Sequence, residues 1–286
     1  MRLVYSSDLH GAITFYQQLL DLAVDEGAHV AIVGGDLLPH AQQLASALDT
    51  QRRFIREQLT PLLRAAKAKQ PDLTLYVIPG NDDWAAAIES LAALEDEGLL
   101  VSVHQRAVQL APDLWLAGSG LIGLTPFGIK DYERRDTADA PAVRFGQSFR
   151  SEGDTIAAYP REQLLALPTL AEELERLGLA SDPARTIYVL HCPPWQTQLD
   201  RRQGGAATGS RAVRDFIQRC QPPLTLHGHI HEGPTVSGAW IEQLGRTVAI
   251  NPGQAQRGFH AVTLDSADPL GSARHTVYGA AGERQL

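Results

Sequence analysis

Cysteine is scarce in this chain, since only Cys192 and Cys220 occur among its 286 residues. They form neither a C-x-x-C pair nor a disulfide framework, so we expect two core thiols in a reduced, cytoplasmic protein. Long apolar runs are missing as well, because no window approaches the roughly 18 residues that a membrane span requires. The N-terminal segment MRLVYSSDLH also lacks the apolar region of a signal peptide. The sequence therefore predicts neither secretion nor membrane insertion.

An excess of positive charge is absent too. The chain has 25 Lys and Arg residues against 33 Asp and Glu residues, which gives a net charge of −8. Such a charge repels nucleic acids and anionic membranes at long range, so we expect neither as the partner. Aromatic residues make up only 6%, but 44% hydrophobic and 20% charged residues are ordinary for a globular protein. This composition excludes a disordered chain and a fibre.

Strand-like and helical segments alternate in the N-terminal part of the chain. Short runs rich in β-branched residues predict buried strands at 3–5, 30–33, 73–78, 186–190 and 224–226. Longer stretches with helical periodicity separate the first four of them, at 13–24, 41–68, 84–97 and 161–177. This alternation predicts βαβ units, in which functional loops leave the carboxyl ends of the strands.

A second group of short strands is closely spaced and has little helix in it. The runs at 101–103, 108–110, 114–117, 239–244, 247–250, 261–264 and 276–278 predict a second, largely antiparallel sheet. Because these runs interleave with the α/β pattern, we expect a single domain over residues 1–286 with two packed sheets. Residues 125–159 form an irregular insert that is longer than most loops, either a binding lid or a disordered segment.

Five short motifs lie where predicted strands end. In an extended segment, side chains two residues apart point the same way, so Asp8 with His10, and His229 with His231, converge on one small volume. Imidazole and carboxylate ligands without thiolate suit divalent ions such as manganese, iron or zinc. The sequence therefore predicts a transition-metal site. The motifs are Asp8-Leu9-His10, Gly35-Asp36, Gly80-Asn81-Asp82-Asp83, His191 and Gly228-His229-Ile230-His231.

Asp36 is the candidate bridge if two ions share this site. Asp36 follows Gly35, which lets the backbone turn closely, and each of its carboxylate oxygens can hold one ion. Asn81 offers a neutral oxygen, so two divalent ions facing Asp8 and Asp36 leave the inner site positive by about two charges. Such a site attracts phosphate, and two ions about 3.5 to 4 Å apart can hold a bridging hydroxide for phosphoester hydrolysis.

The order D-x-H, G-D, G-N, H, G-H-x-H over residues 8–231 resembles the calcineurin-like metallophosphoesterase superfamily. The resemblance covers most of the chain and implies an α/β fold, a four-layer αββα sandwich with two packed, mostly mixed β-sheets. It implies a binuclear metal centre in which Asp36 bridges two ions that share a hydroxide. All seven ligand positions of the family are filled: Asp8, His10, Asp36 and His231 for one ion, and Asp36, Asn81, His191 and His229 for the other.

Asp82 departs from the family's pattern, in which a histidine that contacts the phosphate follows the asparagine. An ionised Asp82 would repel the incoming phosphate, so its carboxyl is expected to be protonated, turned toward a basic residue or bound to solvent. Asp83 matches the acidic residue that often closes the motif. With Asn81 and Asp82 as the catalytic residues, the departure favours phosphodiesters over phosphomonoesters.

Other polar residues near the motifs have simpler interpretations. His227 is interpreted as a hydrogen-bonded strand residue, and His40 as a loop residue near the centre rather than a ligand. The arginines of the insert, together with Arg201 and Arg202, either bind the far side of a phosphorylated substrate or lie in a solvated loop. The remaining candidates are Trp84 and Trp195 for the pocket wall or for packing, Ser210 for a helix cap, and 251–253 for a tight turn.

The motifs predict a metal-dependent phosphoric ester hydrolase that acts on a phosphorylated small molecule. Its cofactors are two divalent metal ions, with manganese or iron favoured and zinc close behind. The alternative is a non-catalytic scaffold for protein binding, because the superfamily includes a retromer subunit that keeps the fold without metal chemistry. A scaffold is expected to lose metal ligands, whereas all seven are kept here. A nuclease is disfavoured by the charge of −8. The motifs indicate neither the substrate nor an oligomeric state.

Overall fold

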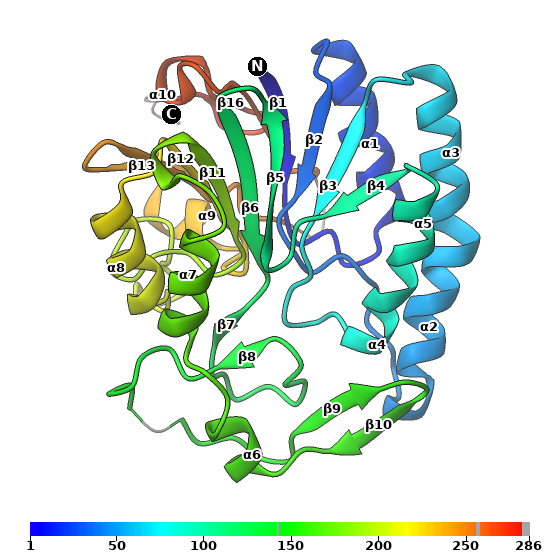
Figure 1. The fold of residues 1–286 in the computed structure, drawn as a ribbon, viewed down its shortest axis with the longest axis vertical. Helices are drawn as coiled ribbons and strands as arrows, with labels where there is room; N and C mark the ends of the chain where they lie inside the picture. Colours follow the sequence, from blue (N-terminus) through cyan, green and yellow to red (C-terminus); the bar gives the residue numbers. More distant parts are fainter. Residues whose placement is uncertain (142, 256–257, 282–286) are drawn as a thin grey trace.

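The computed structural model describes residues 1–141, 143–255 and 258–281. Two large sheets lie face to face at the centre of the molecule, with helices on the outer face of each (Figure 1). The four-layer αββα sandwich and its two mixed sheets are thereby confirmed. The described residues contain no helix with the length and apolar character that crossing a bilayer requires.

The first sheet has seven strands, in the order β17-β16-β15-β1-β2-β3-β4. Its strands are β1 (Arg2–Ser6), β2 (Val30–Val33), β3 (Thr74–Val77), β4 (Leu100–Ser102), β15 (Val262–Asp265), β16 (Arg274–His275) and β17 (Gly279–Ala280). The strands β1 to β4 are mutually parallel, and β15 pairs antiparallel with β1. A helical crossover follows each of β1, β2 and β3 and returns the chain to the end of the sheet at which the next parallel strand starts.

The second sheet has six strands, in the order β13-β14-β12-β11-β6-β5. They are β5 (Arg106–Ala111), β6 (Leu114–Ser119), β11 (Thr186–Leu190), β12 (Leu224–Leu226), β13 (Ile241–Leu244) and β14 (Thr247–Ile250). The four inner strands are parallel, and only the edge strands β5 and β13 are antiparallel. The expectation of a largely antiparallel second sheet was therefore wrong. Runs 101–103 and 261–264 belong to the first sheet, because a short apolar run does not encode its partner or direction.

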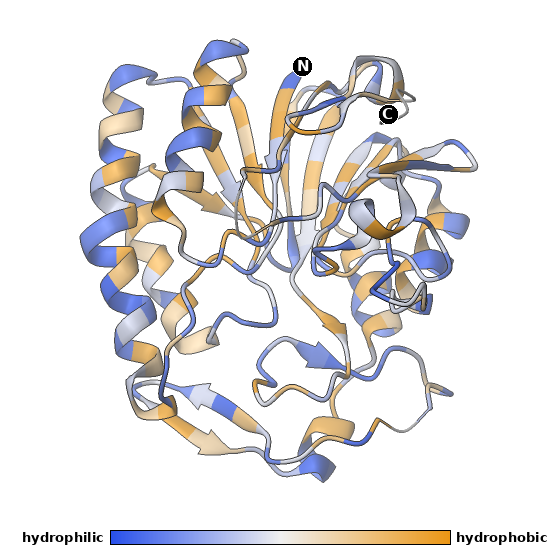
Figure 2. Ribbon diagram, turned by 180° about the vertical axis from the view of Figure 1, so that it is seen from behind, coloured by the Kyte–Doolittle hydropathy of each residue, from blue (hydrophilic) through white to orange (hydrophobic). Residues whose placement is uncertain are grey.

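Alternation along the strands builds the layers. In β1, Leu3 and Tyr5 pack into the core between the sheets, whereas Val4 packs against the helices on the outer side. In β11, Ile187 faces the shared core and Tyr188 faces the other helical layer. Figure 2 shows mostly hydrophobic strands, and helices that carry both hydrophilic and hydrophobic residues. The sandwich follows from this period of two, which gives each sheet two apolar faces to cover.

Helices α1 to α5 accompany the first sheet, and α7 and α8 cover the second (Figure 1). The helix predicted at 41–68 is interrupted by η2, one π-helical turn between α2 and α3. The helix predicted at 161–177 is divided at Pro168, because proline has no backbone N–H to donate. The helices are α1 (Ile13–Asp25), η1 (Leu44–Ser46), α2 (Ala47–Phe54), η2 (Ile55–Leu59), α3 (Thr60–Lys69), α4 (Ala85–Ile88), η3 (Glu89–Leu91), α5 (Ala92–Asp96), α6 (Arg161–Leu165), α7 (Leu170–Gly178), η4 (Pro183–Arg185), α8 (Arg211–Cys220), α9 (Gly233–Ser237) and α10 (Pro269–Ser272).

The segment predicted as an irregular insert carries short strands of its own. It holds β8 (Glu133–Arg134), which pairs with β7 (Ile122–Gly123), and the hairpin of β9 (Phe149–Glu152) and β10 (Thr155–Ala158). Asp131 accepts hydrogen bonds from the backbone N–H of Ala85 (2.9 Å) and from the Ser151 hydroxyl (2.6 Å). These bonds attach the insert to the start of α4, directly after the Asn81 motif.

Candidate metal centre

The polar motifs meet at one end of the two sheets. Asp8, Asp36 and Asn81 follow the parallel strands β1, β2 and β3 of the first sheet. His191 follows β11 of the second sheet directly, and the 228–231 motif follows the neighbouring strand β12. Because parallel strands end at the same edge, all seven residues predicted as ligands come from one rim of the sandwich.

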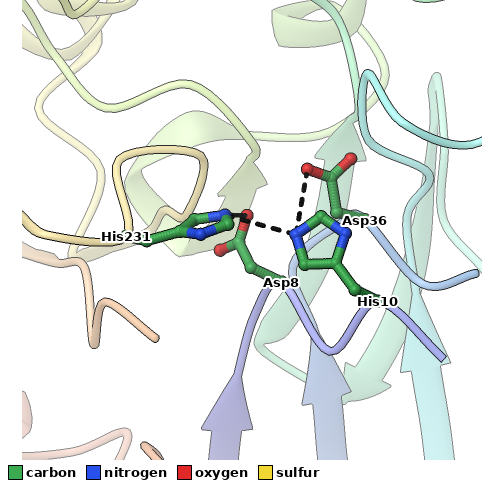
Figure 3. A group of neighbouring side chains, drawn as sticks. All are labelled: Asp8, His10, Asp36 and His231. Atoms are coloured by element: carbon green, nitrogen blue, oxygen red, sulfur yellow. Dashed lines mark hydrogen bonds and ion pairs between the residues drawn. The ribbon is translucent and has the colours of Figure 1, made fainter. Parts of the chain in front are cut away.

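Four of these side chains form a compact group (Figure 3). Asp8, His10, Asp36 and His231 each contribute a donor atom, and these atoms all lie within 4.8 Å of one another. His231 Nε2 lies 3.2 Å from Asp8 Oδ1 and 3.3 Å from His10 Nε2, and His10 Nε2 lies 3.8 Å from Asp36 Oδ2. Two carboxylates and two imidazoles are a donor set suited to a divalent transition metal.

The other predicted ligands lie on the far side of Asp36. His191 Nε2 is 3.5 Å from Asp36 Oδ2 and 3.3 Å from Asn81 Oδ1. The ring of His229 lies 5.3 Å from the ring of His191, centroid to centroid. The same oxygen of Asp36 is therefore 3.8 Å from His10 Nε2 and 3.5 Å from His191 Nε2, as expected for a carboxylate that bridges two ions.

Small residues and backbone bonds orient these side chains. His191 Nδ1 forms a 2.7 Å hydrogen bond with Gly34 O, which turns Nε2 toward the centre. A Cβ atom at Gly35 would lie 2.3 Å from His191 Nδ1, and one at Gly80 would lie 2.2 Å from Asp36 Oδ1. Both positions therefore need glycine, because a methyl group would collide with the side chains of the site.

The electrostatics of the group also fit a cation. Burial alone would raise the pKa of Asp36, but His191 and His10 together outweigh this effect and lower the pKa to about 2. Burial alone would lower the pKa of His191, but Asp36, Asp8 and the hydrogen bond with Gly34 O together outweigh this effect and raise the pKa to about 10. In the absence of an ion, protons on the imidazoles thus balance buried carboxylates. His10 Nδ1 is buried and has no hydrogen-bond partner among the described residues. A divalent ion can replace these protons, so the residues present fit a metal.

Asp82 turns toward the imidazoles of the site. Its Oδ2 lies 3.4 Å from His40 Nε2 and 3.8 Å from His10 Nδ1, and its Oδ1 accepts a 2.9 Å hydrogen bond from Asn81 Nδ2. The ring of His40 stacks on that of His10 at 4.8 Å. Burial, and then the charge of Asp36, raise the pKa of Asp82 to about 6. Sequence reasoning missed the contact between His40 and Asp82. The only available signal was the position of His40 four residues after Asp36.

A cavity of about 450 Å³ opens onto the centre. Asp36, Asn81 and Asp82 form one wall. Phe127 of the insert, the candidate substrate-binding residue Arg202, and Glu232, which no motif indicated, also line this cavity. The volume suits a small-molecule ligand.

The simpler interpretations of neighbouring residues agree with the structure. His227 is buried, with Nδ1 hydrogen-bonded to Leu190 O (2.9 Å) and Nε2 to the Thr225 hydroxyl (2.9 Å). Ser210 caps α8 by accepting the backbone N–H of Val213. Trp84 is buried in the core. The side chain of Asn251 accepts the backbone N–H of Gly253 in a turn. Cys192 and Cys220 are free thiols.

Comparisons with known proteins agree with this architecture. Among solved structures, TT1561 of Thermus thermophilus is similar with a TM-score of 0.60 and 20% identity, over 96% of this chain and 97% of that chain. A dimetal phosphatase from Danio rerio is similar with a TM-score of 0.54 and 11% identity, over 92% of this chain and 91% of that one. At such identities the likeness shows the fold. No curated protein matches the sequence.

The family model of calcineurin-like phosphoesterases matches residues 1–233. The matched region contains every motif at the rim of the sandwich, from Asp8 to His231. Since the match spans well over half of its length, the chain belongs to the calcineurin-like phosphoesterase family and is a hydrolase of phosphoric esters.

Proposed function

We propose that this hydrolase uses two divalent ions to cleave a phosphodiester bond in a small molecule. The observation that carries the proposal is the group of Asp8, His10, Asp36 and His231, whose donor atoms lie within 4.8 Å of one another beside the cavity. These four residues would hold one ion. Asp36 would be shared with a second ion held by Asn81, His191 and His229, an assignment supported by the short distances from His191 to Asp36 and Asn81.

The ions would supply a nucleophile from water at neutral pH and charge stabilisation for the attacked phosphoryl group. The mixed nitrogen and oxygen donors favour manganese or iron, with zinc close behind. The side chains contribute alignment, because His191 is oriented by Gly34 O and Asp8 accepts the backbone N–H of His229 (3.0 Å). The free thiols of Cys192 and Cys220 fit a reducing compartment and support a cytoplasmic location.

Asp82 supports the preference for diesters. It lines the cavity beside Asp36 and Asn81. A phosphomonoester brings up to two negative charges to this wall, whereas a diester brings one, so repulsion by the Asp82 carboxylate penalises the monoester more. Cleavage of a monoester with a poor leaving group also needs a proton donor. In the family, the histidine after the asparagine helps with this step, and in this chain Asp82 stands in its place.

Metal removal and refilling test the binuclear assignment. Protein stripped of metal is expected to hydrolyse bis(p-nitrophenyl) phosphate only after manganese is added, and Asp36→Asn is expected to lower kcat at least about 100-fold because both ions lose a charged ligand. Metal content per chain, measured by elemental analysis, should fall from two ions to fewer in the variant. Full metal-independent turnover would contradict the proposal, and the absence of any bound metal would favour the scaffold.

The diester preference has its own test in Asp82→Asn. The variant keeps the shape of the side chain and removes its charge, so kcat/KM for p-nitrophenyl phosphate is expected to rise about tenfold relative to that for the bis ester. Glu232→Gln, on another wall of the same cavity, serves as the charge-matched control. An unchanged ratio of the two substrates would show that Asp82 does not set the preference.

A further inference from the structure

A second cavity adjoins the metal centre. It has a volume of about 420 Å³, and its wall includes His229, one of the proposed ligands. Leu124, Thr125 and Thr208 line both this cavity and the one at the metal centre. The two cavities therefore adjoin at His229.

Three guanidinium groups line this second cavity. Arg135 follows β8, Arg161 begins α6 and Arg211 begins α8, so three separate elements contribute them. Two arginines outside the cavity, Arg150 and Arg219, each have a carboxylate oxygen within 4.0 Å. In the part of the chain that the structure describes, none of the three cavity arginines has such a partner within that distance.

The arginines are held in place by contacts that leave their charge available. The guanidinium of Arg211 lies over the ring of Trp195 at 4.4 Å, and that of Arg161 over the ring of Phe145 at 4.7 Å. The Nε of Arg135 is buried and has no hydrogen-bond partner in residues 1–141, 143–255 and 258–281. Arg135 and Arg161 are half-buried, whereas Arg211 is exposed but stacked on Trp195, and guanidinium groups held in this way lose little side-chain entropy when they bind an anion.

One acidic residue, Asp136, lies in this wall, and its charge interacts with that of Arg211. Its oxygens are already bonded, one to the Ser210 hydroxyl and the other to the backbone N–H of Arg211 at 2.9 Å. The rest of the wall includes apolar side chains such as Leu124, Leu165 and Trp195. One carboxylate against three arginines leaves the wall with an excess of positive charge, in a protein whose net charge is −8, and this excess favours an anion.

We infer that this cavity binds a second phosphoryl group of the substrate, away from the ester that is cleaved. The substrate class is then a phosphodiester that carries a further phosphate on the far side of an apolar or aromatic spacer. Arginine forks bind phosphate oxygens in pairs, and the apolar wall accommodates the spacer. This inference rests on the proposed function, because it assumes that the ester to be cleaved lies at the metal centre.

A pair of substrates that differ only in this phosphate tests the inference. Manganese-loaded protein would be assayed with thymidine 5′-(4-nitrophenyl phosphate) and with the same ester bearing a 3′-phosphate. We expect the 3′-phosphate to lower KM by about tenfold or more with little change in kcat, since charged hydrogen bonds add to binding but lie far from the reacting group. The triple variant R135Q/R161Q/R211Q is expected to lose this advantage, so that its KM is the same for the two esters.

The control is Arg219→Gln, which removes a charge from the other end of α8, outside the cavity. It should keep the preference for the 3′-phosphorylated ester. Equal KM values for the two esters in the wild-type protein would overturn the inference and leave the proposed function intact. A preference that persists in the triple variant would overturn it as well. If neither ester nor bis(p-nitrophenyl) phosphate is hydrolysed, the proposed function fails and the inference fails with it.

Discussion

Four residues of the metal centre have a left-handed backbone conformation. The φ angles are 58° at Asp8, 44° at His10, 50° at Asp36 and 65° at His229. Residues other than glycine rarely adopt such angles, and each costs on the order of 1–3 kcal/mol. Backbone bonds across the loops hold them, with Asp8 N donating to Gly35 O at 3.0 Å and His10 N to Asp36 O at 2.8 Å. These left-handed conformations therefore orient the side chains of the predicted ligands toward one another before any ion binds.

Asp83 is the residue that ties these loops together. Its side chain is fully buried and accepts the backbone N–H groups of Gly80 (2.8 Å), Leu37 (3.0 Å) and Leu38 (2.8 Å). In this way one carboxyl group joins the loop that carries Asp36 to the loop that carries Asn81.

We expect Asp83→Asn to weaken metal binding without removing a ligand. The asparagine amide places its own N–H donor beside a backbone N–H that needs an acceptor. The loops therefore shift, and the affinity for manganese is expected to fall by about 10- to 100-fold. Isothermal titration of the metal-stripped variant with manganese would measure it. Asp96→Asn, at an exposed position at the end of α5, is the control and should bind as the wild type does. Unchanged affinity in Asp83→Asn would mean that the loops are held by other contacts.

At the scale of elements, a buried ion pair holds the insert together. Lys130 Nζ lies 2.7 Å from Glu133 Oε2, both side chains are fully buried, and Glu133 also accepts the backbone N–H of Thr125 at 2.8 Å. Glu133 belongs to β8, and the backbone N–H of Lys130 donates to Phe149 O at the start of β9 (2.9 Å), so the pair connects β7–β8 with the hairpin β9–β10.

We expect Glu133→Gln alone to lower the free energy of unfolding by about 3–5 kcal/mol, because it leaves the Lys130 charge buried without a counter-charge. The double variant Lys130→Met with Glu133→Leu should lose much less. Urea denaturation of both variants would show the difference. In the exposed pair of Arg56 and Glu57, removal of one charge should change stability by less than about 0.5 kcal/mol. Equal losses in the single and double variants would count against an electrostatic cause.

The elements differ in how far their sequences determine them. The predicted bounds of 30–33, 186–190 and 224–226 coincide with β2, β11 and β12, because continuous apolar runs bounded by polar or glycine residues leave little choice. The helix at 41–68 was predicted as one piece, since nothing in its periodicity marks the π-helical turn at Ile55–Leu59. The sequence also did not predict which sheet each strand joins, because this depends on contacts with strands far along the chain.

At the scale of the whole molecule, buried histidines away from the metal centre make stability depend on pH. His275 Nδ1 accepts the backbone N–H groups of Val277 (3.0 Å) and Tyr278 (3.2 Å), so its Nε2–H donates to Pro252 O at 2.9 Å. This neutral form is held by burial, which lowers the pKa of His275 from 6.5 to about 4. The unfolded chain binds a proton at higher pH than the folded protein does.

We therefore expect stability to be fully present above pH 6.5 and to fall as the pH drops from 6.5 to 4, by up to about 3 kcal/mol for His275. His275→Gln should flatten the dependence of Tm on pH over this window, measured on metal-stripped protein. His29→Gln, at an exposed position, should leave the curve unchanged. If His275→Gln lowers Tm equally at pH 7 and pH 5, the histidine is not the titrating group.

The sequence alone determined which polar residue types follow the strands and in what order, because this depends on residue type and on the local period of strands and loops. Thus Asp8, His10, Asp36 and the 228–231 motif could be assigned to one rim from the order of motifs and strands. Tertiary structure decided which distant residues meet them: His231 reaches Asp8 across 223 positions, His40 turns to Asp82, and Arg135, Arg161 and Arg211 gather around one cavity. These contacts depend on how two sheets and an insert pack together, and no local sequence pattern encodes that packing.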